Sequence, residues 1–412
     1  MTDQSRTARV AVSGIGVVAP GAVGVEAFCE MLREGRSAIR EVERFDTSGL
    51  SAHCAALVES FPAKQYISPM KLRRMNALSR YALGATKLAL EDQRLERIPS
   101  PSVEVGVSLG TTFGPVETSA EYFREYVARG ASFAPPQLFA ESVANAPGSH
   151  IAIELGYEGF NTTFTQRESS AMTALFHGAT QIVKGGVRSV IAGGVEEINE
   201  IVFAVFDRMG ALAHAEGTTT EASRPFDRRR NGIVIGEGAG VFVLVGEEAA
   251  KRGRPWGWIR GFGIGRDGSA PLSDWGADAG AVAATMARAI DDAGLVPEEI
   301  DAVWASASSS VRGDRLEARA IQQLFGSRIP PVVAVKGYFG EYAGAGALQI
   351  AAALVALHEQ FLPASAGYED ADEEMKLPVV RSRAEQPVHH MLINSLSAGG
   401  GMISAVLSSD AE

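Results

Sequence analysis

The most informative part of the chain is a short segment, residues 159–171, which reads Gly159-Phe160-Asn161-Thr162-Thr163-Phe164-Thr165-Gln166-Arg167-Glu168-Ser169-Ser170-Ala171. Ser169 and Ser170 are favourable residues for capping the N-terminus of a helix, and apolar residues at helical spacing follow them. A Gly-Gly pair at 185–186 is a typical stop for this helix. Glu168 is therefore predicted to lie at a helix N-terminus.

On both sides of this segment, short strand-like runs alternate with longer helical patterns, which is typical of a layered α/β fold with mostly internal strands. Predicted strands are Val10–Gly14, Val103–Leu109, Val187–Ala192, Val241–Val245 and Ala302–Ala305, and predicted helices are Val25–Glu34, Met70–Asp92, Val116–Ala128, Arg315–Phe325 and Tyr342–Leu357. The stretch Gly246–Trp258 predicts a surface crossing between two halves. We expect these halves to be residues 1–250 and 251–412.

Composition excludes several classes of protein. The chain has 412 residues, 46% of them hydrophobic, and a formal net charge of −11, so it has the core of a large globular protein but no basic excess for binding nucleic acid. It has no secretory signal and no apolar stretch long enough to cross a bilayer, which predicts a cytoplasmic location. Its two cysteines and seven histidines show no disulfide or metal-ligand spacing. We expect no metal and no cofactor.

Seven motifs, met in order along the chain, resemble those of the β-ketoacyl-acyl carrier protein synthases. The motifs are Val12-Ser13-Gly14-Ile15-Gly16-Val17-Val18, Arg73-Arg74-Met75, Gly110-Thr111-Thr112-Phe113-Gly114, Ala192-Gly193-Gly194-Val195-Glu196, Arg224-Pro225-Phe226-Asp227, Gly236-Glu237-Gly238-Ala239-Gly240 and Lys336-Gly337-Tyr338-Phe339-Gly340. The resemblance implies the thiolase fold, in which two similar α/β halves pack in αβαβα layers.

In condensing members, the resemblance implies a cysteine at the head of the central helix and two histidines on loops of the second half. A helix N-terminus lowers the pKa of a thiol and so favours the thiolate that accepts an acyl chain. The histidines stabilise the enolate that forms when malonyl thioester loses carbon dioxide. Here the three positions hold Glu168, Ser306 and Glu341, and Ala398 stands where a gating aromatic residue is expected.

These changes argue on chemical grounds against condensation by this chain. A carboxylate that attacked a thioester would form a mixed anhydride, which water hydrolyses readily. We expect the helix terminus to hold Glu168 ionised. If Glu168 and Glu341 are buried, Lys336 is the nearest candidate in the sequence to compensate their charge. The simpler interpretation is that both carboxylates are ordinary surface residues.

The pattern resembles the non-condensing branch of the family, the chain-length factors or β subunits of type II polyketide ketosynthases, whose members commonly carry glutamine where Glu168 stands here. This resemblance implies a heterodimer with an active ketosynthase subunit and a growing chain, aromatic or polyene, in a tunnel at the subunit interface. Val116, Ser119 and Phe123 fall at tunnel-shaping positions on one helical face. An acyl carrier protein with a malonyl or polyketide chain is the second expected partner, for which the basic clusters Lys71-Arg73-Arg74 and Arg228-Arg229-Arg230 are candidate contacts.

Two other functions remain open from the sequence. The chain could decarboxylate malonyl-acyl carrier protein and supply starter units, although a negative Glu341 about 5 Å from the enolate would oppose this by roughly 3 kcal/mol at an effective dielectric of ~20. It could also be a homodimeric acyl-binding protein of the same fold. We predict a catalytically inactive subunit of an acyltransferase complex.

Overall fold

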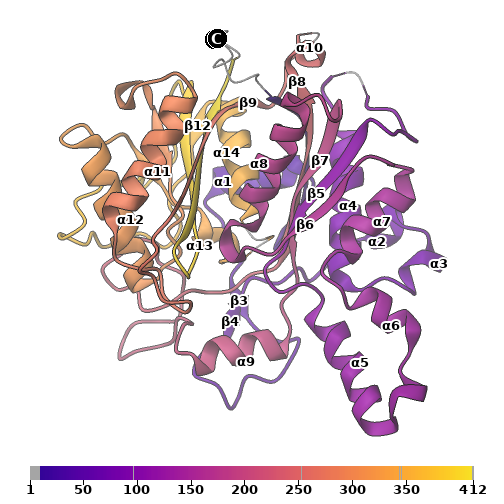
Figure 1. Ribbon diagram of the computed structural model, residues 1–412. Helices are drawn as coiled ribbons and strands as arrows, with labels where there is room; N and C mark the ends of the chain where they lie inside the picture. Colours follow the sequence, from indigo (N-terminus) through magenta and orange to yellow (C-terminus); the bar gives the residue numbers. More distant parts are fainter. Residues whose placement is uncertain (1–9, 96, 252, 343, 345, 411–412) are drawn as a thin grey trace.

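One mixed sheet runs through the molecule and is covered by helices on both of its outer sides (Figure 1). The computed structural model describes residues 10–95, 97–251, 253–342, 344 and 346–410. In these residues the sheet has eleven strands, in the order β11-β10-β14-β15-β9-β1-β8-β7-β5-β6, with β2 paired to β1.

The strands are β1 (Val10–Ala19), β2 (Ala22–Val23), β3 (Arg40–Glu41), β4 (Cys54–Ala55), β5 (Val105–Gly110), β6 (Asn161–Phe164), β7 (Ser189–Glu196), β8 (Gly238–Gly246), β9 (Gly257–Arg266), β10 (Ala302–Trp304), β11 (Val332–Val333), β12 (Phe361–Leu362), β13 (Ala384–Glu385), β14 (His390–Leu396) and β15 (Gly401–Ser408). The α-helices are α1 (Val25–Glu34), α2 (Ala63–Tyr66), α3 (Pro69–Leu72), α4 (Ala77–Glu91), α5 (Val116–Arg129), α6 (Pro136–Glu141), α7 (Ala146–Leu155), α8 (Ser170–Val183), α9 (Glu200–Arg208), α10 (Glu247–Ala250), α11 (Ala279–Asp292), α12 (Val311–Phe325), α13 (Lys336–Phe339) and α14 (Ala347–Glu359). Three short 3₁₀ helices are η1 (Ala131–Phe133), η2 (Arg167–Ser169) and η3 (Pro297–Glu299).

The two halves of the chain repeat one strand order. In the first half the order across the sheet is β6-β5-β7-β8-β1, and in the second it is β11-β10-β14-β15-β9. When the five strands that each half contributes are numbered in chain order, their order across the sheet is third, second, fourth, fifth, first in both halves. The halves join where β1 pairs antiparallel with β9, which follows the proposed division at residue 250.

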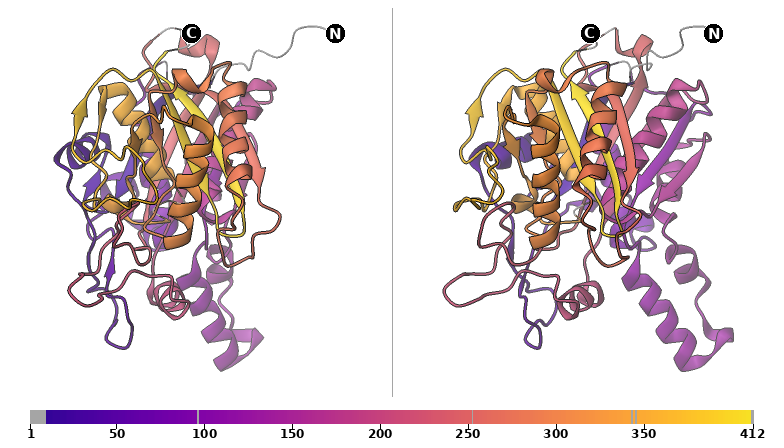
Figure 2. Two further views of the ribbon diagram at one scale, coloured as in Figure 1. Left: turned by 90° about the vertical axis from the view of Figure 1, so that its left-hand side faces the viewer. Right: turned by 60° about the vertical axis from the view of Figure 1, so that its left-hand side comes forward.

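The helices form three layers around the strands, which confirms the predicted αβαβα architecture. Helices α8 and α14 lie in the central layer, where their apolar residues pack with strand residues of both halves in one large core. Helix α4 covers the outer side of the first half and α11 with α12 that of the second (Figures 1 and 2). In the described residues, no helix is both long and apolar enough to cross a membrane.

Two helix predictions need correction. The predicted helix Met70–Asp92 is two helices, α3 (Pro69–Leu72) and α4 (Ala77–Glu91), because Asn76 caps a new start by accepting a hydrogen bond from the Ser79 N–H at 2.7 Å. The predicted helix Tyr342–Leu357 begins only at Ala347. Tyr342 lies in the preceding loop with φ of 64°, a left-handed conformation that does not continue a helix.

The N-terminus of α8 approaches the sheet so closely that only glycine fits beneath it. A Cβ at Gly110, the last residue of β5, would lie 2.3 Å from the Ser170 carbonyl carbon. A Cβ at Gly194 in β7 would lie 2.8 Å from the Ala171 Cβ and 2.2 Å from the Gly344 oxygen. These two positions fix the depth at which α8 and the preceding turn, which carries Glu168, are buried.

We expect Gly110→Ala to destabilise the protein, because the added methyl group must push the first turn of α8 away from β5. Overpacking of this kind costs about 1–3 kcal/mol or more. Urea unfolding followed by circular dichroism measures the change. Gly49→Ala is the matched control, since a Cβ there meets nothing within 4 Å. Equal stability of the two variants would contradict the assigned packing.

Candidate functional site

Glu168 lies in the one-turn helix η2 (Arg167–Ser169), directly before α8, and only 2% of its surface is exposed. Its backbone is held from the second half of the chain, because the Ser395 hydroxyl donates to the Glu168 carbonyl oxygen at 3.2 Å. The next residue is held likewise, since the Ser169 N–H donates to Ser397 Oγ at 3.1 Å. Arg167 has φ of 52°, which is rare for a residue with a side chain and directs Glu168 inward.

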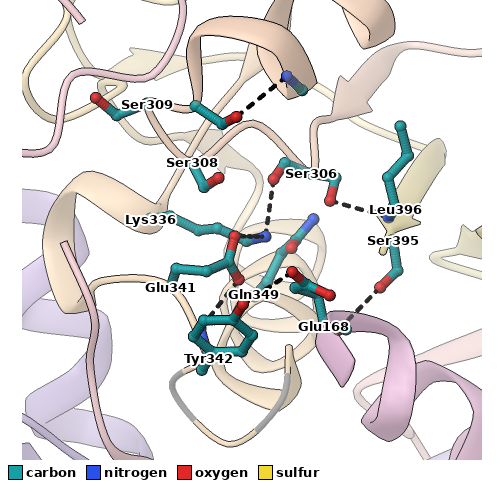
Figure 3. Close-up of polar contacts among 12 residues, drawn as sticks. Glu168, Ser306, Ser308, Ser309, Lys336, Glu341, Tyr342, Gln349, Ser395 and Leu396 are labelled. Atoms are coloured by element: carbon teal, nitrogen blue, oxygen red, sulfur yellow. Dashed lines mark hydrogen bonds and ion pairs between the residues drawn. The ribbon is translucent and has the colours of Figure 1, made fainter. Parts of the chain in front are cut away.

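Tyr342 joins two buried carboxylates. Its hydroxyl donates to Glu168 Oε1 at 3.0 Å, and its backbone N–H donates to Glu341 Oε1 at 3.0 Å. Figure 3 shows the Tyr342 ring beside Glu168, with Glu341 and Lys336 next to them. The loop before α14 therefore meets the loop before α8.

Lys336 and Glu341 form a buried ion pair. The Lys336 Nζ lies 2.8 Å from Glu341 Oε2, and these side chains are 4% and 0% exposed. The same Nζ donates to the Ser306 carbonyl oxygen at 2.7 Å. The structure thus brings together Glu168, Glu341, Ser306 and Lys336. In this group Lys336 forms its ion pair with Glu341 and not with Glu168.

Ser306 has a structural role in this arrangement. Its hydroxyl accepts a hydrogen bond from the Leu396 N–H at 3.0 Å, and its N–H donates to Glu317 Oε1 at 2.9 Å. Asn394 also donates to Glu317 Oε1, at 2.9 Å. The Ser306 side chain therefore supports the backbone of the loop that carries Ala398.

The expectation of an ionised Glu168 is wrong. Burial, followed by the nearby negative charge of Glu341, raises the pKa of the Glu168 carboxyl to about 7, although the Tyr342 hydroxyl opposes the shift. Desolvation of a buried charge outweighs the favourable field of a helix terminus. At neutral pH this carboxyl is shared between its protonated and ionised forms.

A cavity of about 750 Å³ lies beside Glu168. Its walls combine aromatic and apolar side chains with a few polar ones, and Ala398 is among them. The rings of Phe113, Phe206 and Tyr342 line it and touch one another, with centroids 5.3 to 5.6 Å apart. Neither cysteine and none of the histidines belongs to this lining.

The three predicted tunnel residues lie on α5 in different surroundings. Val116 packs against an apolar cluster that includes Phe203. The Ser119 hydroxyl has two backbone carbonyl acceptors within hydrogen-bonding distance, those of Pro115 at 3.0 Å and Ser142 at 3.1 Å. Phe123 is 60% exposed. Helices α5 and α6 project from the body of the protein, as Figures 1 and 2 show, so these positions follow one arm from its base outward.

One of the two predicted basic clusters is already neutralised within the chain. Arg229 and Arg230 lie 2.8 Å from Glu369 and Asp372, and Arg228 lies 3.6 Å from Asp370. Lys71, in the other cluster, pairs with Glu154. Acidic residues of the 369–372 loop offset the charge of cluster 228–230, which weakens its attraction for an acidic carrier protein.

Sequence reasoning missed three functionally placed residues, Tyr342, Glu317 and Gln349. Gln349 lies in α14 and donates to the carbonyl oxygens of Ala305 and Asn394, both at 3.0 Å. The side chain of each of the three forms a hydrogen bond with a distant segment of the chain. A polar residue inside the near-uniformly apolar run 346–357 was the one available signal, and it pointed to Gln349.

Comparison with known proteins decides the family. Residues 7–250 match the β-ketoacyl synthase N-terminal domain, and residues 256–369 match the β-ketoacyl synthase C-terminal domain. The chain belongs to the β-ketoacyl synthase family. It is 31% identical to the tetracenomycin polyketide synthase ketoacyl synthase alpha subunit of Streptomyces glaucescens, covering 97% of this chain and 96% of that protein. It is 29% identical to the 3-oxoacyl-[acyl-carrier-protein] synthase 2 of Vibrio cholerae, covering 95% and 97%.

Solved structures agree with this assignment. The ishigamide ketosynthase/chain length factor superimposes with a TM-score of 0.90 at 30% identity, covering 98% of this chain and all of that one. A β-ketoacyl synthase of Burkholderia phymatum gives a TM-score of 0.87 at 25% identity. The chain is therefore a ketosynthase-like protein of the type II polyketide kind, and its relatives include synthases named for the condensing activity.

We expect Glu168→Gln to remove a pH dependence of stability. The pKa of Glu168 is raised in the folded protein above its ordinary value of 4.5, so its contribution is present below pH 4.5 and is lost as pH rises through about 7. Between pH 4.5 and 8 the native chain should therefore lose roughly 3 kcal/mol of its free energy of unfolding through Glu168, a loss that Glu168→Gln does not share.

Urea unfolding across this pH range, with the exposed Glu373→Gln as control, measures the difference. Parallel pH profiles for the native chain and Glu168→Gln would show that Glu168 carries no buried charge.

Proposed function

We propose that this chain is the non-condensing, chain-length-factor subunit of a type II polyketide ketosynthase heterodimer, and that it shapes the tunnel for the growing chain. The observation that carries the proposal is the buried Glu168 at the position where condensing members carry their cysteine. Cys29 lies in α1 and Cys54 in β4, away from the cavity beside Glu168. An intermediate therefore has no thiol to which it could be tethered.

The two other altered positions support the same conclusion. The Ser306 hydroxyl accepts a hydrogen bond from the Leu396 N–H at the end of β14, and the Ser306 N–H donates to Glu317. Glu341 is engaged by Lys336 and by the Tyr342 N–H. Neither can stabilise an enolate as a neutral or cationic imidazole would. Decarboxylation of malonyl thioester is disfavoured for this reason.

The surface of the first half supports binding of a partner subunit. The arm formed by α5 and α6 exposes apolar side chains that a monomer rarely leaves uncovered, namely Phe123, Tyr126, Val127, Phe133 and Phe139, which are 44% to 80% exposed. Strand β6 is the last strand of the sheet in the same half, so its outer edge has unpaired backbone groups. An active ketosynthase subunit that covers this side would supply the cysteine and the histidines. The solved ishigamide ketosynthase/chain length factor is a precedent for the pairing.

Co-expression with candidate ketosynthase subunits tests the proposal. Native mass spectrometry should show a heterodimer, and malonyl-loaded acyl carrier protein should be consumed only when both subunits are present and the partner's cysteine is intact. Release of carbon dioxide by the isolated chain would support the decarboxylase. A stable homodimer that ignores every ketosynthase would support an acyl-binding protein.

We expect Val116→Phe to shorten the products of the heterodimer, because Val116 lies at the base of the α5 arm and a phenyl ring there fills space that an isopropyl group leaves open. Product lengths read by liquid chromatography and mass spectrometry should fall by one or more elongation steps. Val296→Phe, at an exposed position of the second half, is the matched control. Unchanged product length with Val116→Phe would show that Val116 does not line the tunnel.

A further inference from the structure

The cavity beside Glu168 has hydrogen-bond acceptors that no residue of the chain satisfies. Among the described residues, Glu168 Oε2, Asn231 Oδ1 and Thr112 Oγ1 are buried and have no hydrogen-bond partner. All three residues line this one cavity. Unsatisfied buried polar atoms are costly in folded proteins, and the grouping of three of them around one cavity favours a hydrogen-bonding partner there, water or a ligand.

When Glu168 is ionised, the chemistry of these atoms favours a hydrogen-bond donor as that partner. A carboxylate oxygen and an amide oxygen only accept hydrogen bonds, and a hydroxyl oxygen accepts as well as donates. Ketone oxygens and carboxylates offer no donor, so a poly-β-ketone or a malonyl carboxylate does not complement this lining. An ammonium group offers three N–H donors.

The charges around the cavity favour a cation at its Glu168 end. Lys336 is committed to Glu341, and no ion pair to Glu168 is present in the described residues. Arg312, which also lines the cavity, pairs with Asp274 and is 73% exposed at its rim. Arg167 is exposed to solvent as well. The buried carboxyl therefore has neither a counter-ion of its own nor full hydration.

The walls of the cavity suit the same ligand. Phe113, Phe206 and Tyr342 line it beside Glu168, and Trp275 lines it too. The faces of aromatic rings attract ammonium groups, by about 0.5–2 kcal/mol for each contact, more where water is excluded. Aromatic rings also bury the apolar body of a small ligand.

We propose that this cavity binds a small molecule with a protonated primary amine on a compact apolar body, with the ammonium group at Glu168. Such binding needs neither a nucleophile nor a partner subunit, so it goes beyond the proposed chain-length role and does not depend on it. The altered residue Glu168 then acts as a binding residue for a cation. Its carboxylate supplies the negative charge, and Asn231 and Thr112 supply further acceptors.

Calorimetric titration of the full chain at pH 8 tests the proposal, with 2-phenylethylamine and 2-phenylethanol as probes. The two probes have the same body and differ in the charge of the head group. We expect the amine to bind about tenfold tighter than the alcohol or better, as a charge-assisted hydrogen bond implies. Equal affinities, or no binding of the amine, would overturn the proposal.

Variants locate the ammonium group. Glu168→Gln keeps the shape of the side chain and removes its charge, so it should weaken amine binding by about tenfold and leave alcohol binding unchanged. Asp274→Asn is the control, because this carboxylate lines the same cavity but is already paired with Arg312. Amine binding that survives Glu168→Gln would contradict the assignment.

A crystal structure decides the matter independently of any variant. The native chain soaked with 2-(4-bromophenyl)ethylamine should show the anomalous signal of bromine inside the cavity, with the nitrogen within hydrogen-bonding distance of Glu168. Bromine at any other place, or the amine turned toward the rim, would show that the site does not bind ammonium.

Discussion

The close packing of α8 against β5 and β7 sets the constraint on which the rest of the site depends. Gly110 and Gly194 leave no space between the helix and the sheet, so residue 168 is buried whichever side chain it carries. A third contact comes from the second half, where a Cβ at Gly346 would lie 2.9 Å from the backbone carbonyl oxygen of Glu168. A thiol fits such a position without electrostatic cost, but a carboxyl does not.

The second half of the chain offsets that cost with specific contacts. A helix terminus stabilises a nearby anion by about 1 kcal/mol, whereas burial of an ion costs several kcal/mol. Tyr342 gives Glu168 one hydrogen bond, and Lys336 keeps the neighbouring Glu341 compensated. These contacts do not offset the whole cost of burying the Glu168 carboxyl, so its pKa is raised and its Oε2 has no hydrogen-bond partner. The same buried carboxyl gives the cavity beside it a polar, partly charged surface.

The sequence predicted the fold and the place of Glu168 just before α8, and the reasons are local. Serines before an apolar helix and a Gly-Gly stop after it placed Glu168 at the N-terminus of α8, and the repeated strand signals indicated the layered architecture. Contacts between distant segments could not be predicted in this way. The Tyr342 hydroxyl reaches Glu168 only because the loop before α14 folds back with a left-handed residue, and periodicity instead extended the helix over Tyr342. The charge state of Glu168 depends on its burial, which no spacing reveals.

The central claim is that this chain cannot hold an acyl intermediate, and its intact mass tests this most directly. The purified chain, with Cys29 and Cys54 blocked by alkylation, is incubated with an acyl-loaded carrier protein and analysed by mass spectrometry. The account predicts the mass of the alkylated chain alone at every time point. An added acyl mass that hydroxylamine removes and that is absent from Glu168→Gln would contradict it.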